Sequence, residues 1–251
     1  MKIPLLVSSL AILSILVLHI TVASGIIFRA WIFLISMWIG AQTTVSDLLL
    51  DSSPSNTGWE TNADSSEPFI RVCGETTIFG GSPNFGAGVF AWKTYTGLPA
   101  HYQATVSVKL FFIDSWDEES LSLIADGNTV YQESYTVIES PYPDTCGNSD
   151  PDKIITITSS PFSHNTSNLT LNFTTTLDEA GTEESFGFNN IYITLDLCDS
   201  ACSNCTGPNN TECTSCNSGW FLYETTCNTT CPDRYYANTT TNICDSKLFL
   251  I

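Results

Sequence analysis

Apolar and polar residues alternate through the middle of the chain, which is the pattern of strands with one buried face. Residues 104–113 place four large apolar side chains on one side: Val106, Val108, Leu110 and Phe112. Residues 121–125 and 129–135 also favour strands, and the Asp126-Gly127-Asn128 turn between them is a strong hairpin signal. Residues 190–197 alternate again and predict a final strand.

Around residue 170, large apolar residues alternate with asparagine and threonine. Leu169, Leu171 and Phe173 point to one side, and Asn168 and Asn172 point to the other. Residues 42–197 contain no amphipathic helical pattern. We therefore expect a mainly β fold, with a jelly-roll-like β-sandwich over residues 69–197 and a Ser/Asp/Pro-rich entry linker over residues 42–68.

The amino terminus has the features of a secretory signal. Lys2 precedes an apolar run over residues 3–20, and a second apolar run over residues 26–41 is broken only by Arg29. We expect residues 1–41 to be one long cleaved signal peptide. An uncleaved membrane anchor and a start assigned too far upstream are the alternatives, and membrane contact is expected only through this segment.

The chain has ten cysteines, and eight of them lie in residues 198–244. Large aliphatic residues become scarce at Cys198, so disulfides must replace a hydrophobic core there. Two CxxC pairs in this segment are compatible with zinc, but the seven residues between them are few for a zinc ribbon. Thiolate ligands also do not suit a secretory protein. A tail over residues 245–251 follows the last cysteine.

Glycosylation signals and charge agree with a secreted chain. Seven N-x-S/T triplets without proline begin at Asn165, Asn168, Asn172, Asn204, Asn209, Asn228 and Asn238. All 26 acidic residues lie after residue 41, whereas two of the eight basic residues, Lys2 and Arg29, lie before it. Such a surface repels nucleic acid and anionic lipid, attracts cations and keeps the protein soluble.

The segment of residues 198–244 resembles the furin-like, growth-factor-receptor cysteine-rich repeat. The likeness rests on the CxxxCxxC start, the Gly-Pro pair after the third cysteine, the later CxxC and the Gly219-Trp220 step. This resemblance implies a spacer or stalk. It also implies the pairs Cys198–Cys205, Cys202–Cys213, Cys216–Cys227 and Cys231–Cys244, which leaves Cys73–Cys146 for the β-sandwich.

The motifs FFIDSWDEES (residues 111–120) and EESFGFNNIYITL (residues 183–195) resemble a β-sandwich domain of repeat-rich surface proteins from single-celled eukaryotes. The acidic-Ser-Phe-Gly step is also similar to galactose-binding-like jelly rolls and other carbohydrate-binding modules. These resemblances imply a binding role at the cell surface.

The first of these motifs carries clustered carboxylates in a loop between two strands. Asp114, Asp117 and Glu119 are candidate ligands for a structural calcium ion, which takes six to eight oxygen ligands. A solvated acidic loop is the alternative. Trp116 could stack on a sugar ring as a ligand-binding residue, or it could close the core.

The chain lacks a catalytic constellation. His101 and His164 are the only histidines after residue 41, and no G-x-S-x-G motif occurs. We expect an extracellular or cell-surface protein that is not an enzyme, whose sandwich binds a glycan or an extracellular protein. The alternative is a structural coat or stalk protein with no soluble ligand.

Overall fold

The structure is a computed structural model that describes residues 41–47, 58–64, 68–137 and 141–247. Residues 1–40, 48–57, 65–67, 138–140 and 248–251 lie outside these ranges, and they include most of the expected signal segment and part of the expected entry linker. Within the described ranges, no helix is long and apolar enough to cross a membrane.

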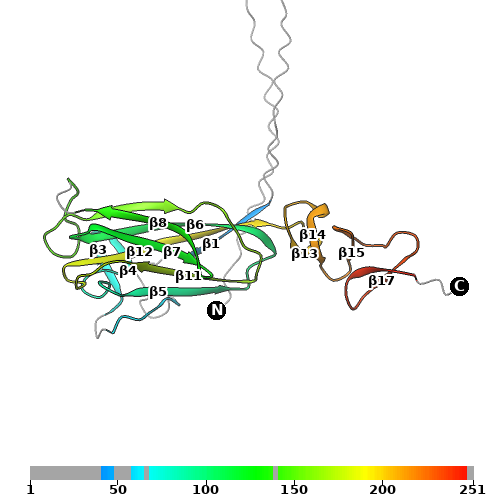
Figure 1. Ribbon diagram of the computed structural model, residues 1–251, viewed down its shortest axis with the longest axis horizontal. Coiled ribbons are helices and arrows are strands. Elements are labelled where there is room, and N and C mark those ends of the chain that lie inside the picture. The colour runs from blue at the N-terminus through cyan, green and yellow to red at the C-terminus, as the bar shows by residue number, and fades with distance from the viewer. Residues whose placement is uncertain (1–40, 48–57, 65–67, 138–140, 248–251) are drawn as a thin grey trace, which may run out of the picture.

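Two antiparallel sheets form the larger part of the described chain, and their strands run along the long axis of the molecule (Figure 1). The seven-stranded sheet follows the order β10-β6-β12-β4-β3, with β1 beside β12 and β9 beside β6. Its strands are β1 (Gln42–Asp47), β3 (Ile70–Cys73), β4 (Thr76–Gly80), β6 (His101–Asp114), β9 (Lys153–Thr158), β10 (Phe162–Ser163) and β12 (Glu184–Leu197). The five-stranded sheet follows the order β2-β5-β11-β7-β8. Its strands are β2 (Glu60–Thr61), β5 (Phe90–Thr96), β7 (Asp117–Ala125), β8 (Asn128–Thr136) and β11 (Asn168–Thr175).

The core lies between the two sheets and is built by the alternation seen in the sequence. Val106, Val108, Leu110 and Phe112 of β6 are fully buried, and so are Leu169, Leu171 and Phe173 of β11. Aromatic rings meet in its centre: the ring centroids of Phe173 and Phe188 lie 4.4 Å apart. The predicted β-sandwich is confirmed.

The hairpin predicted at Asp126-Gly127 joins β7 to β8, with Ala125 paired to Asn128. Asp126 (φ 46°) and Gly127 (φ 81°) both have positive φ, as the preferred two-residue hairpin turn requires.

The sandwich begins earlier in the chain than the sequence predicted. Residues 42–47 form β1 along β12, and Trp59, from the expected linker, packs in the core. β1 is mostly polar and β2 (Glu60–Thr61) is very short, so neither shows the alternation of apolar and polar residues that marks a half-buried strand. Edge strands often have this character because only one side pairs with a neighbour.

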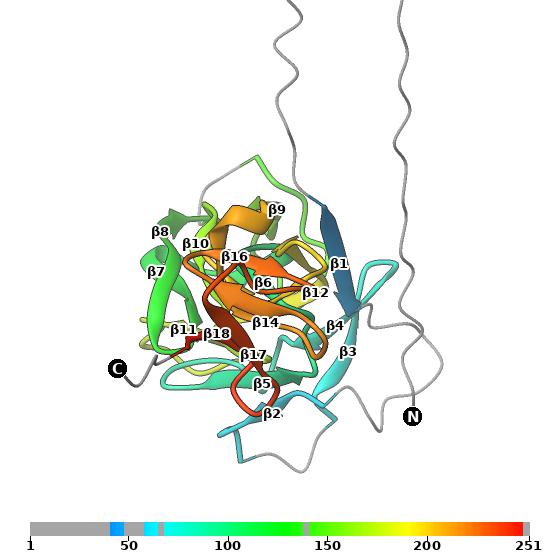
Figure 2. The ribbon, with the colours of Figure 1, turned by 90° about the vertical axis from the view of Figure 1, so that its right-hand side faces the viewer.

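The cysteine-rich segment continues from the end of β12 and projects from one end of the sandwich (Figure 1). Figure 2 views the molecule from that end, with this segment in front of the sandwich. It contains a two-stranded and a four-stranded sheet with one short 3₁₀ helix. The elements are β13 (Cys202–Cys205), η1 (Asn210–Glu212), β14 (Cys213–Cys216), β15 (Phe221–Tyr223), β16 (Thr226–Asn228), β17 (Tyr235–Asn238) and β18 (Ile243–Ser246).

All ten cysteines form disulfides, in the pairing that the resemblance implied. The pairs are Cys73–Cys146, Cys198–Cys205, Cys202–Cys213, Cys216–Cys227 and Cys231–Cys244. The first ties β3 to the loop before β9, and the other four lie in the cysteine-rich segment.

Candidate ligand-binding pocket

The three predicted calcium ligands do not form one group. Asp114 is fully buried, and its Oδ1 accepts a hydrogen bond from the backbone N–H of Asn148 at 2.7 Å. Its backbone N–H donates to Oδ1 of Asp152, a second buried carboxylate, at 3.1 Å. Burial, together with the nearby Asp152 carboxylate, raises the pKa of Asp114 to about 6.

Glu119 instead joins Asp178 and Glu184, with one carboxylate oxygen from each within 4.8 Å of the others. Glu184 is buried, and its Oε1 accepts hydrogen bonds from the N–H groups of Asp178 and Glu179. Burial raises the pKa of both Glu119 and Glu184. Calcium takes six to eight oxygen ligands, so these three carboxylates would need to bind in bidentate fashion or be joined by further oxygen ligands to hold it.

The ligand-binding interpretation of Trp116 needs correction. Its side chain is fully buried, its ring meets Phe112 edge-on, and its indole N–H donates to the Ser185 carbonyl at 2.8 Å. A sugar ring cannot reach this indole. The alternative, that Trp116 closes the core, describes its position.

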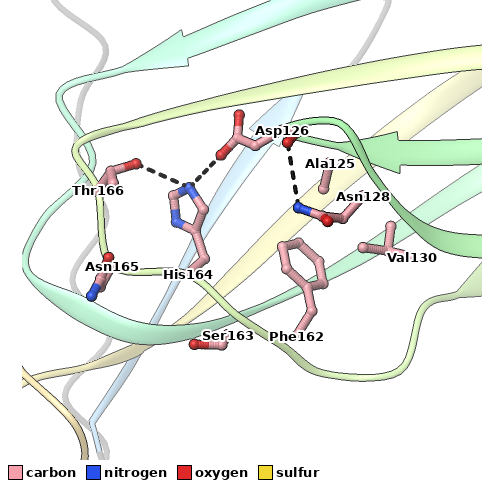
Figure 3. A pocket seen from close by; sticks show the side chains of 9 residues that line it. All are labelled: Ala125, Asp126, Asn128, Val130, Phe162, Ser163, His164, Asn165 and Thr166. Carbon is pink, nitrogen blue, oxygen red and sulfur yellow. Dashed lines mark hydrogen bonds and ion pairs between the residues drawn. The ribbon is translucent and has the colours of Figure 1, made fainter.

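A pocket of about 410 Å³ opens at the other end of β7, beside the β7–β8 turn (Figure 3). Two chain segments line it: residues 125–130, without Gly127 and Thr129, and residues 162–166. Figure 3 shows the imidazole of His164 beneath Asp126, with the Phe162 ring between His164 and the side chains of Asn128 and Val130. The lining residues are Ala125, Asp126, Asn128, Val130, Phe162, Ser163, His164, Asn165 and Thr166.

Asp126 is held in place from two sides. Its Oδ1 accepts the backbone N–H of Thr170 at 2.8 Å, and its Oδ2 lies 3.0 Å from Nε2 of His164. About 41% of its side chain remains exposed, compared with 6% for His164. The carboxylate therefore faces the pocket from a fixed position, with hydrogen-bond acceptor capacity to spare.

His164 belongs to a chain of contacts that needs three hydrogens. Its Nδ1 lies 2.6 Å from Nε2 of His101, whose Nδ1 in turn faces the Pro99 carbonyl. Its Nε2 faces the Asp126 carboxylate and, at 3.1 Å, the Asn168 carbonyl. Two neutral imidazoles carry only two N–H hydrogens, so they cannot donate to all of these contacts at once.

Burial lowers the pKa of His101, the nearby His164 lowers it further, and the Pro99 carbonyl offsets this only in part. The Nε2 of His164 faces the Asp126 carboxylate at 3.0 Å. The pocket thus presents a carboxylate and an imidazole beside the Phe162 ring.

Sequence reasoning did not find this pocket. The sequence pattern places Asp126 in a hairpin turn and gives His164 no particular role. Residues 126 and 164 meet only because the end of β10 passes beside the β7–β8 turn. The presence of just two histidines after residue 41 of an acidic chain was the one available signal.

The seven predicted glycosylation sites differ in the freedom of their side-chain amides. Those of Asn209, Asn228 and Asn238 donate hydrogen bonds to Glu212, Thr226 and Asp245. Asn165 lies in the pocket wall, Asn168 and Asn172 lie on β11, and Asn204 lies on β13.

Comparisons with known proteins give distant likenesses only. No family model matches the chain, and no curated protein matches it. Among solved structures, the sugar-binding C-terminal domain of EclA is 23% identical over 41% of this chain, which spans 64% of that structure, with a TM-score of 0.29.

Two further structures are spanned almost completely. The xylan-binding CBM22-1 domain of Paenibacillus barcinonensis Xyn10C is 11% identical over 62% of this chain and 95% of its own, with a TM-score of 0.35. The K1 cleaved adhesin domain of Lys-gingipain from Porphyromonas gingivalis is 13% identical over 60% of this chain and 97% of its own, with a TM-score of 0.38. The description of the fold therefore rests on the strands and pairings given above.

Proposed function

We propose that the protein is a non-catalytic cell-surface glycoprotein whose β-sandwich binds a glycan in the pocket beside the β7–β8 turn. The observation that carries the proposal is the convergence of Asp126, Asn128 and His164 around the Phe162 ring. A pocket of about 410 Å³ lies within the range of small-molecule sites, which combine apolar walls with a few fixed polar groups.

This combination suits a sugar ring. Sugar hydroxyls donate to carboxylate oxygens and exchange hydrogen bonds with side-chain amides, and Asp126 and Asn128 supply one of each. The Phe162 ring offers an apolar surface for the C–H face of the sugar. Because Asp126 is already held by the Thr170 N–H, little conformational entropy is lost when a ligand binds.

The cysteine-rich segment would act as a spacer, and the chain would reach the cell surface through the secretory pathway. Five disulfides support an oxidising compartment, and seven sequons suit the same route. The furin-like character of residues 198–244 and the signal role of residues 1–41 are parts of this proposal.

The test is binding of the secreted, oxidised protein to a panel of immobilised glycans, with calcium and with chelator. Asp126→Asn removes the pocket carboxylate, and asparagine tolerates the positive φ of this position. Asp117→Asn is the matched control, because it removes the same charge at the opposite end of β7.

We expect binding to one sugar class, at least about tenfold weaker in Asp126→Asn, which corresponds to about 1.4 kcal/mol. Binding should be unchanged in Asp117→Asn and in chelator. If both substitutions weaken binding equally, the pocket is not the site. If no glycan binds, the structural-coat alternative takes its place.

A further inference from the structure

The outer face of the five-stranded sheet carries an apolar strip away from the pocket. The ring centroids of Phe90 and Trp92 on β5 lie 5.4 Å apart, and both side chains are only partly buried. Cross-strand pairing puts both on the face opposite the core, because their partners on β11 alternate with the buried Leu171 and Phe173. Two adjacent, partly exposed aromatic rings on a sheet surface form a small apolar patch that another group can cover.

A glycosylation signal lies in the middle of this strip. Asn172 on β11 is directly opposite Trp92 on one side and Ile124 of β7 on the other. Thr174, which completes the Asn172-Phe173-Thr174 signal, is directly opposite Phe90. Side chains directly opposite in antiparallel strands have their Cβ atoms about 4.5–5.5 Å apart. Asn172 and Thr174, which define the signal, therefore each lie directly beside one of the two aromatic residues.

The side chain of Asn172 is oriented for attachment. Its Oδ1 is buried without a hydrogen-bond partner, which costs about 1–3 kcal/mol for such a group. Its Nδ2 is not among the buried atoms that lack a partner. It also donates no side-chain hydrogen bond among the described residues. The amide nitrogens of Asn209 and Asn238, in contrast, donate to carboxylates at 2.7 Å.

We propose that Asn172 carries an N-linked glycan whose first sugar packs on Trp92 and Phe90, so that the protein's own glycan covers this sheet face. In the attachment step, Nδ2 of Asn172 loses a proton and forms a bond to C1 of N-acetylglucosamine. The donor is a lipid-linked diphosphate oligosaccharide, and the lipid diphosphate leaves with the bonding electron pair. The C–H face of the first sugar then covers apolar ring surface that is otherwise in water.

The proposal distinguishes Asn172 from its neighbour on the same strand and face. Asn168 also begins a signal, but it is directly opposite Thr96, an exposed polar residue. Four residues along a strand correspond to about 13 Å, so a first sugar on Asn168 does not reach the Trp92 ring. Since the pocket lies at the end of the sheet and not on this face, the attached glycan and the proposed ligand occupy different surfaces.

The experiment uses the full chain secreted from glycosylating eukaryotic cells, with each glycan trimmed enzymatically to its first sugar. Mass spectrometry gives the occupancy of Asn172, and hydroxyl-radical footprinting gives the oxidation rate of Trp92. Thr174→Val removes the signal while keeping Asn172 and a β-branched residue in the strand. Thr170→Val removes the Asn168 signal in the same way and is the control. Asn172→Gln also removes the signal, and it leaves the residue opposite Phe90 unchanged.

We expect Asn172 to be occupied in the wild-type protein. Trp92 should oxidise at least about threefold faster in Thr174→Val and Asn172→Gln, because one face of its ring is uncovered. Thr170→Val should match the wild type. An unoccupied Asn172, or equal Trp92 oxidation in all four proteins, overturns the proposal. If a variant is not secreted, enzymatic removal of all glycans from the folded wild-type protein gives the same comparison.

Discussion

The sandwich and the cysteine-rich segment are neighbours in one chain, but different forces hold them together. In the sandwich, aromatic and aliphatic side chains from both sheets form one continuous core. In the cysteine-rich segment, the buried cluster consists of Ala201 and five cysteines. The first region is stabilised mainly by removal of apolar surface from water, and the second mainly by covalent restriction of its unfolded state.

The two regions also differ in where they bury charge. The buried carboxylates Asp114, Asp152 and Glu184 lie at one end of the sandwich. Among the described residues after Cys198, no acidic side chain is buried. The comparison shows that a large apolar core can carry the cost of buried acids, whereas a disulfide-held segment keeps its charges in water.

The largest expected effect is truncation of the sandwich core. Phe173 is fully buried, and its ring lies 4.4 Å from that of Phe188 and 5.6 Å from that of Trp59. Phe173→Ala should destabilise the sandwich by about 3–5 kcal/mol. Denaturant unfolding followed by tryptophan fluorescence measures this, since Trp59 and Trp116 report on the core. Tyr236→Ala, at an exposed position of the cysteine-rich segment, should have little effect. Equal losses in both would mean that the core is not the dominant force.

Removing one disulfide should instead destabilise the cysteine-rich segment and leave the stability of the sandwich unchanged. Cys216→Ala combined with Cys227→Ala deletes a bridge that spans 11 residues. Loss of such a bridge costs about 2–4 kcal/mol, and we expect the loss to remain within residues 213–246. Hydrogen exchange resolved by segment provides the measurement. Faster exchange in β6 or β12 as well would show that the two regions unfold together.

A smaller effect is expected in the pH dependence of stability, because the buried carboxylate of Asp114 lies in the sandwich. The pKa of Asp114 is raised from 3.8 to about 6 in the folded state, so between these values the folded protein binds more protons than the unfolded chain. Stability from this group is therefore present at low pH and lost as pH rises through about 6.

Asp114→Asn removes this dependence, and asparagine tolerates the positive φ of residue 114. The variant should be more stable than the wild type at pH 7, by on the order of 2 kcal/mol, with the difference shrinking toward pH 4. The lowered pKa of His101 acts with the opposite sign, but it is common to both proteins. Thermal unfolding from pH 4 to pH 8 measures the difference. A variant less stable than the wild type at pH 7 would show that the buried Asp114 carboxylate does not destabilise the folded protein.

The sequence predicted features that depend on local patterns. Alternation identified β6, β11 and β12 because one side of each strand is buried, and Asp126-Gly127 identified its hairpin because few residue pairs accept two positive φ values. The disulfide pairing came from the resemblance of residues 198–244 to a known repeat. Spacing alone leaves 105 pairings open for eight cysteines.

The candidate sites could not be predicted, because they depend on which loops meet. Asp114 (φ 67°) and Glu118 (φ 109°) have left-handed backbone conformations that turn neighbouring carboxylates in different directions. Asp114 thus meets Asp152, while Glu119 meets Glu184. The pocket likewise joins residues 126 and 164, which no local pattern connects. Trp116 was ambiguous because residue type does not determine whether a loop tryptophan faces inward.

The claim that an apolar core holds the sandwich and disulfides hold the cysteine-rich segment is tested most directly by hydrogen–deuterium exchange of the intact, oxidised protein before and after reduction of its disulfides. The account predicts that reduction leaves amides of β6, β11 and β12 protected, while residues 198–246 exchange as an unfolded chain. Loss of protection in the sandwich strands at the same reductant concentration would contradict it, because the apolar core would then be unable to hold the sheets without the bridges.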